Sequence, residues 1–204
     1  MATSRRWTRS GVWYRLNAAL VIQVRTQQGR ESQPSATIID SQSVKTSEGG
    51  EERGVDVYKQ AAGRKRHFVV DTLGLLQIVV VHSASLQDGS GGKLVLQKLF
   101  DLIKHSVYNR YCRLKLLWVD AAYEGIREYV RKKFGWKLEI VRRFEGVKGF
   151  KVLPHRWIVE TFYQAGKEYL GLDEYHMRDA EAIRKHWCLV FVAHSLLHLD
   201  CLPA

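Results

Sequence analysis

Apolar residues recur along this chain with two different spacings, which together predict an alternation of strands and helices. Helical spacing predicts helices over residues 11–24, 93–104, 125–134, 155–169 and 180–199. Short apolar runs rich in β-branched residues predict strands over residues 37–40, 67–72, 76–83, 114–120 and 138–142. The order of these elements predicts an α/β fold with a mixed five-stranded sheet and helices on its faces.

Glycines and polar residues mark the predicted connections. Residues 73–75 separate two strands and are typical of a hairpin turn. Residues 43–62 are polar and contain Gly49 and Gly50, so they predict a loop, and residues 89–92 predict a turn.

The amino-acid composition limits the size, the partners and the location that the protein can have. The 204 residues are 46% hydrophobic, enough for one domain with a core, and the formal charge of +11 favours a polyanionic partner. A charge excess that serves solubility is the alternative. The three cysteines show no metal-ligand spacing and indicate structural thiols in a reducing cytoplasm, and no apolar run reaches membrane-spanning length.

Three carboxylates are placed where they could converge on one point. Asp40 and Asp120 each end an apolar run, and Glu160 lies on a predicted helix. A turn cap is the ordinary role of one aspartate at a strand end. Three acids gathered together repel one another unless cations neutralise them, so the set predicts Mg²⁺ or Mn²⁺ and phosphoryl transfer on nucleic acid.

Basic residues near these acids are candidates for phosphate contacts. Arg156 and Lys167 share a helix face with Glu160, where the alternative is a solvated ion pair.

A second basic group precedes the strand over 67–72. Arg64, Lys65 and Arg66 are predicted to lie on a loop that passes over DNA, with a solvated surface run as the alternative. In an extended segment Lys65 points away from the two arginines, so only part of this group can contact phosphate. Lys45 is a weaker candidate of the same kind.

Four sequence blocks carry a resemblance to a known family. They are IIDSQSVKT (38–46), GRKRHFVVDTLGLL (63–76), WVDAAYEG (118–125) and VLPHRWIVE (152–160). In order and spacing they resemble the DDE transposases of bacterial insertion sequences, in the IS-five-like group. The resemblance implies an RNase H-like catalytic core in which Asp40, Asp120 and Glu160 hold two divalent metal ions. Asp71 and Asp88 fall on no acid position of these blocks, so we leave them out of the predicted site.

The chain departs from the family pattern in two places. Ala121 and Ala122 stand where relatives commonly carry glycine, and Leu153 stands at the tyrosine position of the helix pattern that Arg156, Glu160 and Lys167 otherwise fit.

The resemblance also implies a division into three parts. Residues 1–34 form an N-terminal helix and linker, residues 35–170 the RNase H-like DDE catalytic domain, and residues 171–204 a C-terminal helical extension. Relatives carry a DNA-binding region before the segment that matches Trp7, so we expect a homodimer or an assembly with a separately encoded DNA-binding part.

The expected activity is Mg²⁺-dependent cleavage of double-stranded DNA at transposon ends, followed by attack of the freed 3′-hydroxyl on target DNA. The expected location is the bacterial cytoplasm, with the protein on the nucleoid when it binds DNA. Two alternatives stay open: a nuclease or resolvase that cuts without joining, and a catalytically silent remnant that binds DNA or a partner subunit.

Overall fold

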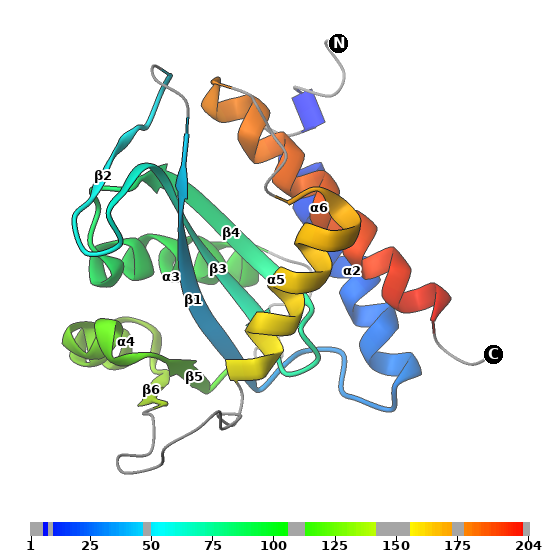
Figure 1. Cartoon of the computed structure of the whole chain (residues 1–204). Helices are drawn as coiled ribbons and strands as arrows, with labels where there is room; N and C mark the ends of the chain where they lie inside the picture. Colours follow the sequence, from blue (N-terminus) through cyan, green and yellow to red (C-terminus); the bar gives the residue numbers. More distant parts are fainter. Residues whose placement is uncertain are drawn as a thin grey trace, which may run out of the picture.

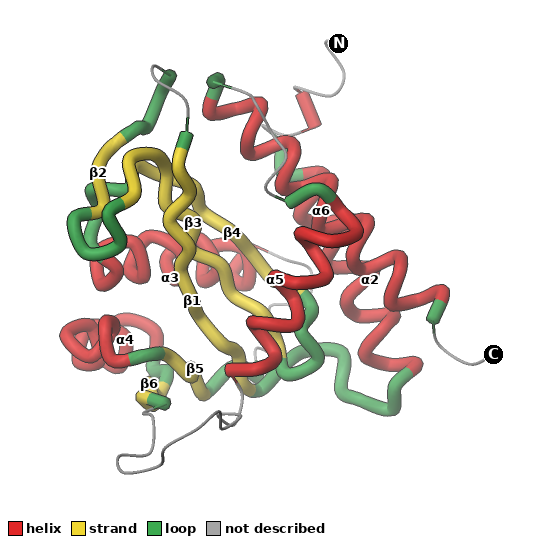
Figure 2. Tube along the Cα trace, viewed as in Figure 1, coloured by secondary structure: helices red, strands yellow, loops and turns green. Residues whose placement is uncertain are grey.

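A mixed β-sheet forms the centre of the molecule, and helices pack on it (Figure 1 and Figure 2). The computed structural model describes residues 6–7, 10–46, 50–105, 113–141, 156–172 and 178–201. The strands are β1 (Ala36–Lys45), β2 (Gly54–Asp56), β3 (Ala61–Asp71), β4 (Leu76–Ser83), β5 (Leu116–Val119) and β6 (Lys137–Ile140). The helices are α2 (Val12–Gln27), α3 (Asp88–His105), the 3-10 helix η2 (Ala121–Ile126), α4 (Arg127–Phe134), α5 (Arg156–Leu170) and α6 (Ala180–Asp200).

The sheet has the expected mixed topology. Its strand order is β2-β3-β1-β5-β6, and β4 also pairs with β3. Strand β3 is antiparallel to β1, β2 and β4, whereas β5 is parallel to β1 and β6. Parallel neighbours need crossover connections, which contain α3 before β5 and η2 with α4 before β6. The predicted RNase H-like α/β fold is therefore confirmed, with the short strand β2 added to the five predicted strands.

Alternation along the strands divides the core into two layers. Ile39 packs in a buried cluster with residues of α3, η2 and α4, whereas its neighbour Ile38 packs in a second cluster with residues of α5 and α6. Successive side chains of a strand point to opposite faces, so each β1 residue belongs to one layer or the other.

Helix α6 is part of this core. Its residues Ile183, Trp187 and Phe191 are buried in the same cluster as Ile38, and α2 packs against α6 and β4. The domain boundaries predicted at residues 34 and 170 stay predictions, although both flanking helices pack onto the sheet.

The predicted hairpin is confirmed and is anchored by a buried aspartate. Gly74 occupies the turn between β3 and β4 with a φ of +78°. Asp71 Oδ1 accepts hydrogen bonds from the backbone N–H groups of Leu73 and Leu75, and Asp71 Oδ2 lies 2.5 Å from Arg25 Nη1 of α2. Asp71, which we left out of the site, thus holds the hairpin against α2.

One predicted connection is wrong in part and a second is wrong throughout, and in each region a glycine allows close packing. Residues 43–62 include the end of β1 and all of β2, and the segment around Gly63 is the start of β3. A Cβ atom on Gly63 would lie 1.9 Å from the Val44 carbonyl oxygen, because two strands approach closely there. Residues 89–92 belong to α3, where a Cβ atom on Gly91 would lie 2.3 Å from Cε1 of His67.

Two remaining expectations concern membranes and thiols. Within the described ranges, no helix is both long enough and apolar enough to cross a membrane. Cys188 is buried and Cys201 is exposed, both as free thiols, whereas Cys112 lies outside the described residues.

Candidate active site

Asp40 and Asp120 lie on neighbouring parallel strands. The last register pair between β1 and β5 is Ile38 with Trp118, and each aspartate follows two residues later. Two residues along an extended chain return to the same face, so both aspartates project toward the layer that contains Ile38 and Trp118. Adjacent strands lie about 5 Å apart, so the backbones of the two aspartates are separated by about one strand spacing. Asp40 lies within β1 and not at its end as predicted, because β1 continues to Lys45.

Each aspartate is held by a nearby backbone N–H group. Asp40 Oδ1 accepts a hydrogen bond from Ser41 N at 2.7 Å. Asp120 Oδ1 accepts one from Ala122 N at 2.9 Å and so caps η2. Strand β5 ends just before Asp120, and the pairing of β1 with β5 ends at Ile38. The two strands therefore separate at the two aspartates. Ligands of open α/β sheets bind at such a switch point.

Tyr123 is a buried residue whose hydroxyl is influenced by two of the predicted acids and by Asp88. Its side chain is fully buried in the cluster that contains Ile39. Burial raises the pKa of Tyr123 well above its usual value, and the charges of Asp40, Asp88 and Asp120 raise it further. Three carboxylates therefore act on the same buried hydroxyl group.

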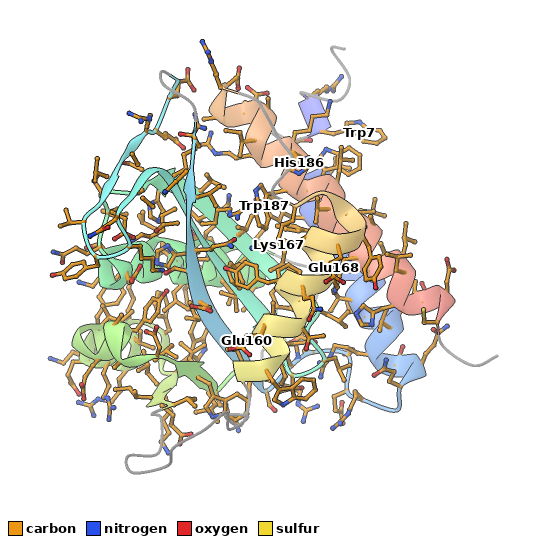
Figure 3. The ribbon with its side chains drawn as sticks, viewed as in Figure 1. Trp7, Glu160, Lys167, Glu168, His186 and Trp187 are labelled. Atoms are coloured by element: carbon orange, nitrogen blue, oxygen red, sulfur yellow. The ribbon has the colours of Figure 1, made fainter. Side chains whose placement is uncertain are left out.

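Glu160 lies on the helix that packs beside β1. Helix α5 contacts β1, and Ile158 and Phe162 of α5 are buried in the core beneath it. Glu160 is exposed near the start of the helix, on the same side of it as Lys167 (Figure 3). Lys167 is exposed as well, whereas the side chain of Arg156 lies outside the described residues.

The three predicted acids do not close around a single point. Nowhere in the described ranges do three His, Cys, Asp or Glu side chains come close enough together to hold a metal ion. The structure thus places two acids on neighbouring strands and the third on a helix that packs against β1.

The comparison with protein families assigns this chain to a family. The sequence profile of the transposase DDE domain matches residues 31–196, which include Asp40, Asp120 and Glu160. This chain belongs to the transposase DDE domain family. A search among curated proteins found no match. The match begins before β1 and runs through most of α6, so the transposase domain includes the last helix of the core.

The basic residues predicted to lie on a loop are instead inside the transposase domain. Arg64, Lys65 and Arg66 belong to β3 and are only 1%, 3% and 0% exposed. Both interpretations of these residues, a loop over DNA and a solvated surface run, are therefore wrong. The three side chains have polar partners inside the fold. Lys45, at the end of β1, is exposed.

The two buried arginines hold segments that are distant in the sequence. Arg64 donates to the backbone carbonyls of Glu51 and Arg178. Arg66 donates to the Leu172 carbonyl and packs over the Trp187 ring, 4.6 Å from its centroid. Both arginines therefore connect β3 to the C-terminal part of the chain.

Lys65 points to the opposite face, as the alternation predicted, and bridges two carboxylates. Its Nζ lies 3.0 Å from Asp56 Oδ2 and 3.0 Å from Asp88 Oδ1. Burial alone would raise the pKa of Asp56, but hydrogen bonds from Ser43 and Lys65 outweigh it and lower that pKa to about 2. Sequence reasoning missed this group, since Asp56 was assigned to a loop and Asp88 fell on no family motif.

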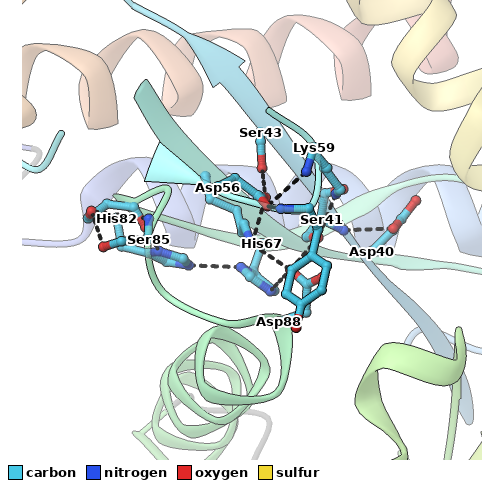
Figure 4. A network of polar contacts seen from close by, with 12 residues as sticks. Asp40, Ser41, Ser43, Asp56, Lys59, His67, His82, Ser85 and Asp88 are labelled. Carbon is cyan, nitrogen blue, oxygen red and sulfur yellow. Dashed lines mark hydrogen bonds and ion pairs between the residues drawn. The ribbon is translucent and has the colours of Figure 1, made fainter. Parts of the chain in front are cut away.

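A histidine pair, His67 and His82, belongs to the same polar network as Asp56 and Asp88 (Figure 4). His67 Nδ1 and His82 Nε2 are 2.8 Å apart, and His82 Nδ1 lies 2.8 Å from the Ser83 carbonyl oxygen. A neutral pair fits these contacts if His82 donates to the carbonyl and His67 donates to His82. Burial and the neighbouring His82 lower the pKa of His67 to about 3, so His67 is neutral at physiological pH.

Proposed function

We propose that this chain is the catalytic domain of a DNA transposase that cleaves the ends of a mobile element and joins them to target DNA. The placement of Asp40 and Asp120 side by side at the point where β1 and β5 part carries the proposal. Membership of the transposase DDE domain family supports it. The four sequence blocks favour the IS-five-like group of bacterial insertion sequences.

The donor set fits Mg²⁺ or Mn²⁺. Asp40 and Asp120 offer carboxylate oxygens, the ligand type that these hard cations prefer, and Glu160 of α5 is the third proposed ligand. Two bound ions would neutralise the acids and polarise the reacting oxygens of the phosphodiester.

The chain's own residues orient and neutralise the reacting groups. The N–H groups of Ser41 and Ala122 hold one oxygen of each aspartate, so the two carboxylates are aimed before DNA arrives. In this proposal three cations contact DNA phosphates: Lys45, which is exposed at the end of β1, Lys167, which is exposed on α5, and Arg156 of the same helix. The formal charge of +11 favours such binding and makes it dependent on salt.

The proposed partners are the transposon ends and the target duplex, which phosphate contacts alone do not distinguish. Selection of the ends also needs base contacts, and we propose a homodimer or an assembly with a separately encoded DNA-binding part as their source.

The test is a strand-transfer assay on DNA that carries the ends of the parent element. With Mg²⁺ or Mn²⁺, the proposal predicts joined products from donors with a 3′-hydroxyl and none from donors with a 3′-dideoxy end. Nicking without joining from both donors would identify a nuclease or resolvase. DNA binding without any cleavage would identify a silent remnant.

A further inference from the structure

Ser41 occupies the centre of a polar network beside Asp40 (Figure 4). Its backbone N–H donates to Asp40 Oδ1 at 2.7 Å, and its hydroxyl donates to Asp88 Oδ1 at 2.9 Å. Lys59 Nζ donates to its carbonyl oxygen at 3.3 Å. Because the serine side chain and the Asp40 side chain belong to opposite faces of β1, this residue connects the two layers.

Asp88 is itself held in place. It is the first residue of α3 and pairs with the buried Lys65, which also pairs with Asp56. Burial alone would raise the pKa of Asp88, but hydrogen bonds from Lys65 and Ser41 lower it. The carboxylate is therefore ionised at neutral pH and accepts the hydrogen bond from the Ser41 hydroxyl. A charged acceptor makes that bond stronger than one between neutral groups.

We propose that Asp88 is a positioning residue for the transposase reaction, acting through Ser41 to orient the Asp40 carboxylate. The inference rests on the proposed function, in which Asp40 is a catalytic metal ligand. Groups that orient metal ligands typically change metal affinity or activity by about 10- to 100-fold when they are removed. Asp88 contacts neither metal nor DNA in this role.

The serine side chain can be changed without changing the backbone. Ser41→Ala removes the bond to Asp88, together with the longer one that Lys59 Nζ donates to the same hydroxyl at 3.4 Å. It keeps the backbone N–H group that donates to Asp40 Oδ1, and Ser41→Thr restores a hydroxyl. Ser195→Ala is a matched control, because Ser195 is also buried and its hydroxyl donates to Asn17 Oδ1 at 2.9 Å, far from the site in sequence. Asp40→Asn tests the proposed function separately.

Three measurements on the full chain test the inference: Mn²⁺ affinity, kcat and KM for cleavage of element-end DNA, and the exchange rate of the residue 41 amide proton. Ser41→Ala should weaken Mn²⁺ binding and lower kcat, each by about tenfold, with KM changed less than twofold. Its residue 41 amide should exchange faster. Ser41→Thr should lie within about threefold of wild type on all three measures, and Ser195→Ala should match wild type.

The outcomes separate the two proposals. If Asp40→Asn abolishes Mn²⁺ binding and cleavage but Ser41→Ala leaves both unchanged, Asp88 positions nothing. If Ser41→Thr is as impaired as Ser41→Ala, the hydroxyl bond is not the cause and the inference is overturned. If Asp40→Asn changes neither measure, the proposed function itself fails, whatever the serine variants do.

Discussion

Lys65 provides the sharpest test of the structure, because its charge is buried between two carboxylates. The substitution Lys65→Met keeps an unbranched side chain of similar length and removes the ammonium group. Asp56 and Asp88 would then lose the cation that lies 3.0 Å from each of them.

The expected loss of stability follows from the burial of this ion pair. The side chains of Lys65 and Asp56 are 4% and 3% exposed, so water cannot replace the lost partner. Breaking a buried ion pair by removing one member typically destabilises a protein by about 3–5 kcal/mol. At roughly 2–4 °C for each kcal/mol in a chain of this size, the melting temperature should fall by about 6–20 °C.

Thermal unfolding followed by circular dichroism at pH 7.5 and pH 5 measures the effect. The fall in melting temperature caused by Lys65→Met should be smaller at pH 5. In that variant Asp56 and Asp88 are buried without their cation, so their pKa values rise and they take up protons in the folded state. In the wild type, Asp56, with a pKa of about 2, stays ionised at both pH values. Lys132→Met on the exposed face of α4 is the control and should change stability by less than about 0.5 kcal/mol. Equal melting temperatures for the two variants would refute the burial of Lys65.

Three other predictions use the same structure. Gly91→Ala should destabilise the fold by about 1–3 kcal/mol in urea unfolding, since the new methyl group meets the His67 ring, whereas Gly125→Ala, with open space around it, should not. The unfolding free energy should fall as pH drops from about 6.5 toward 3, because His67 takes up a proton in the unfolded state but stays neutral in the folded state, where its pKa is about 3. His67→Gln should make the unfolding free energy less dependent on pH in this range, and an unchanged slope would contradict the prediction. Lys167→Ala should lower the slope of log Kd for DNA against log salt by about 0.9, whereas Lys132→Ala should leave it unchanged; equal slopes for all three proteins would argue against the phosphate contact.

The sequence predicts best where one local pattern decides the outcome. The apolar runs before Asp40 and Asp120 specify strands, and the periodicity around Glu160 specifies a helix, so the elements that carry the three acids follow from local spacing. The distance from Glu160 to the two aspartates depends on how α5 packs on β1, which no local pattern contains.

The sequence-based predictions are wrong where the same residue type serves two different structural purposes. The glycines at residues 89–92 predicted a turn, but Gly91 lies within a helix, where the His67 ring packs against it and leaves no room for a side chain. Charged residues usually indicate a solvated surface, but Lys65 and Asp56 neutralise each other inside the sheet. Their partnership is set by the pairing of β3 with β2 and β1, and a reading of single segments misses it.

The most direct test of the central claim is metal-dependent cleavage of element-end DNA by the wild type and by Asp120→Asn. Asparagine keeps a side-chain oxygen that can cap η2 through Ala122 N, so the fold should be retained while a metal-binding charge is lost. We expect Mg²⁺- or Mn²⁺-dependent products from the wild type and none from the folded variant. Cleavage by Asp120→Asn at the wild-type rate would contradict it.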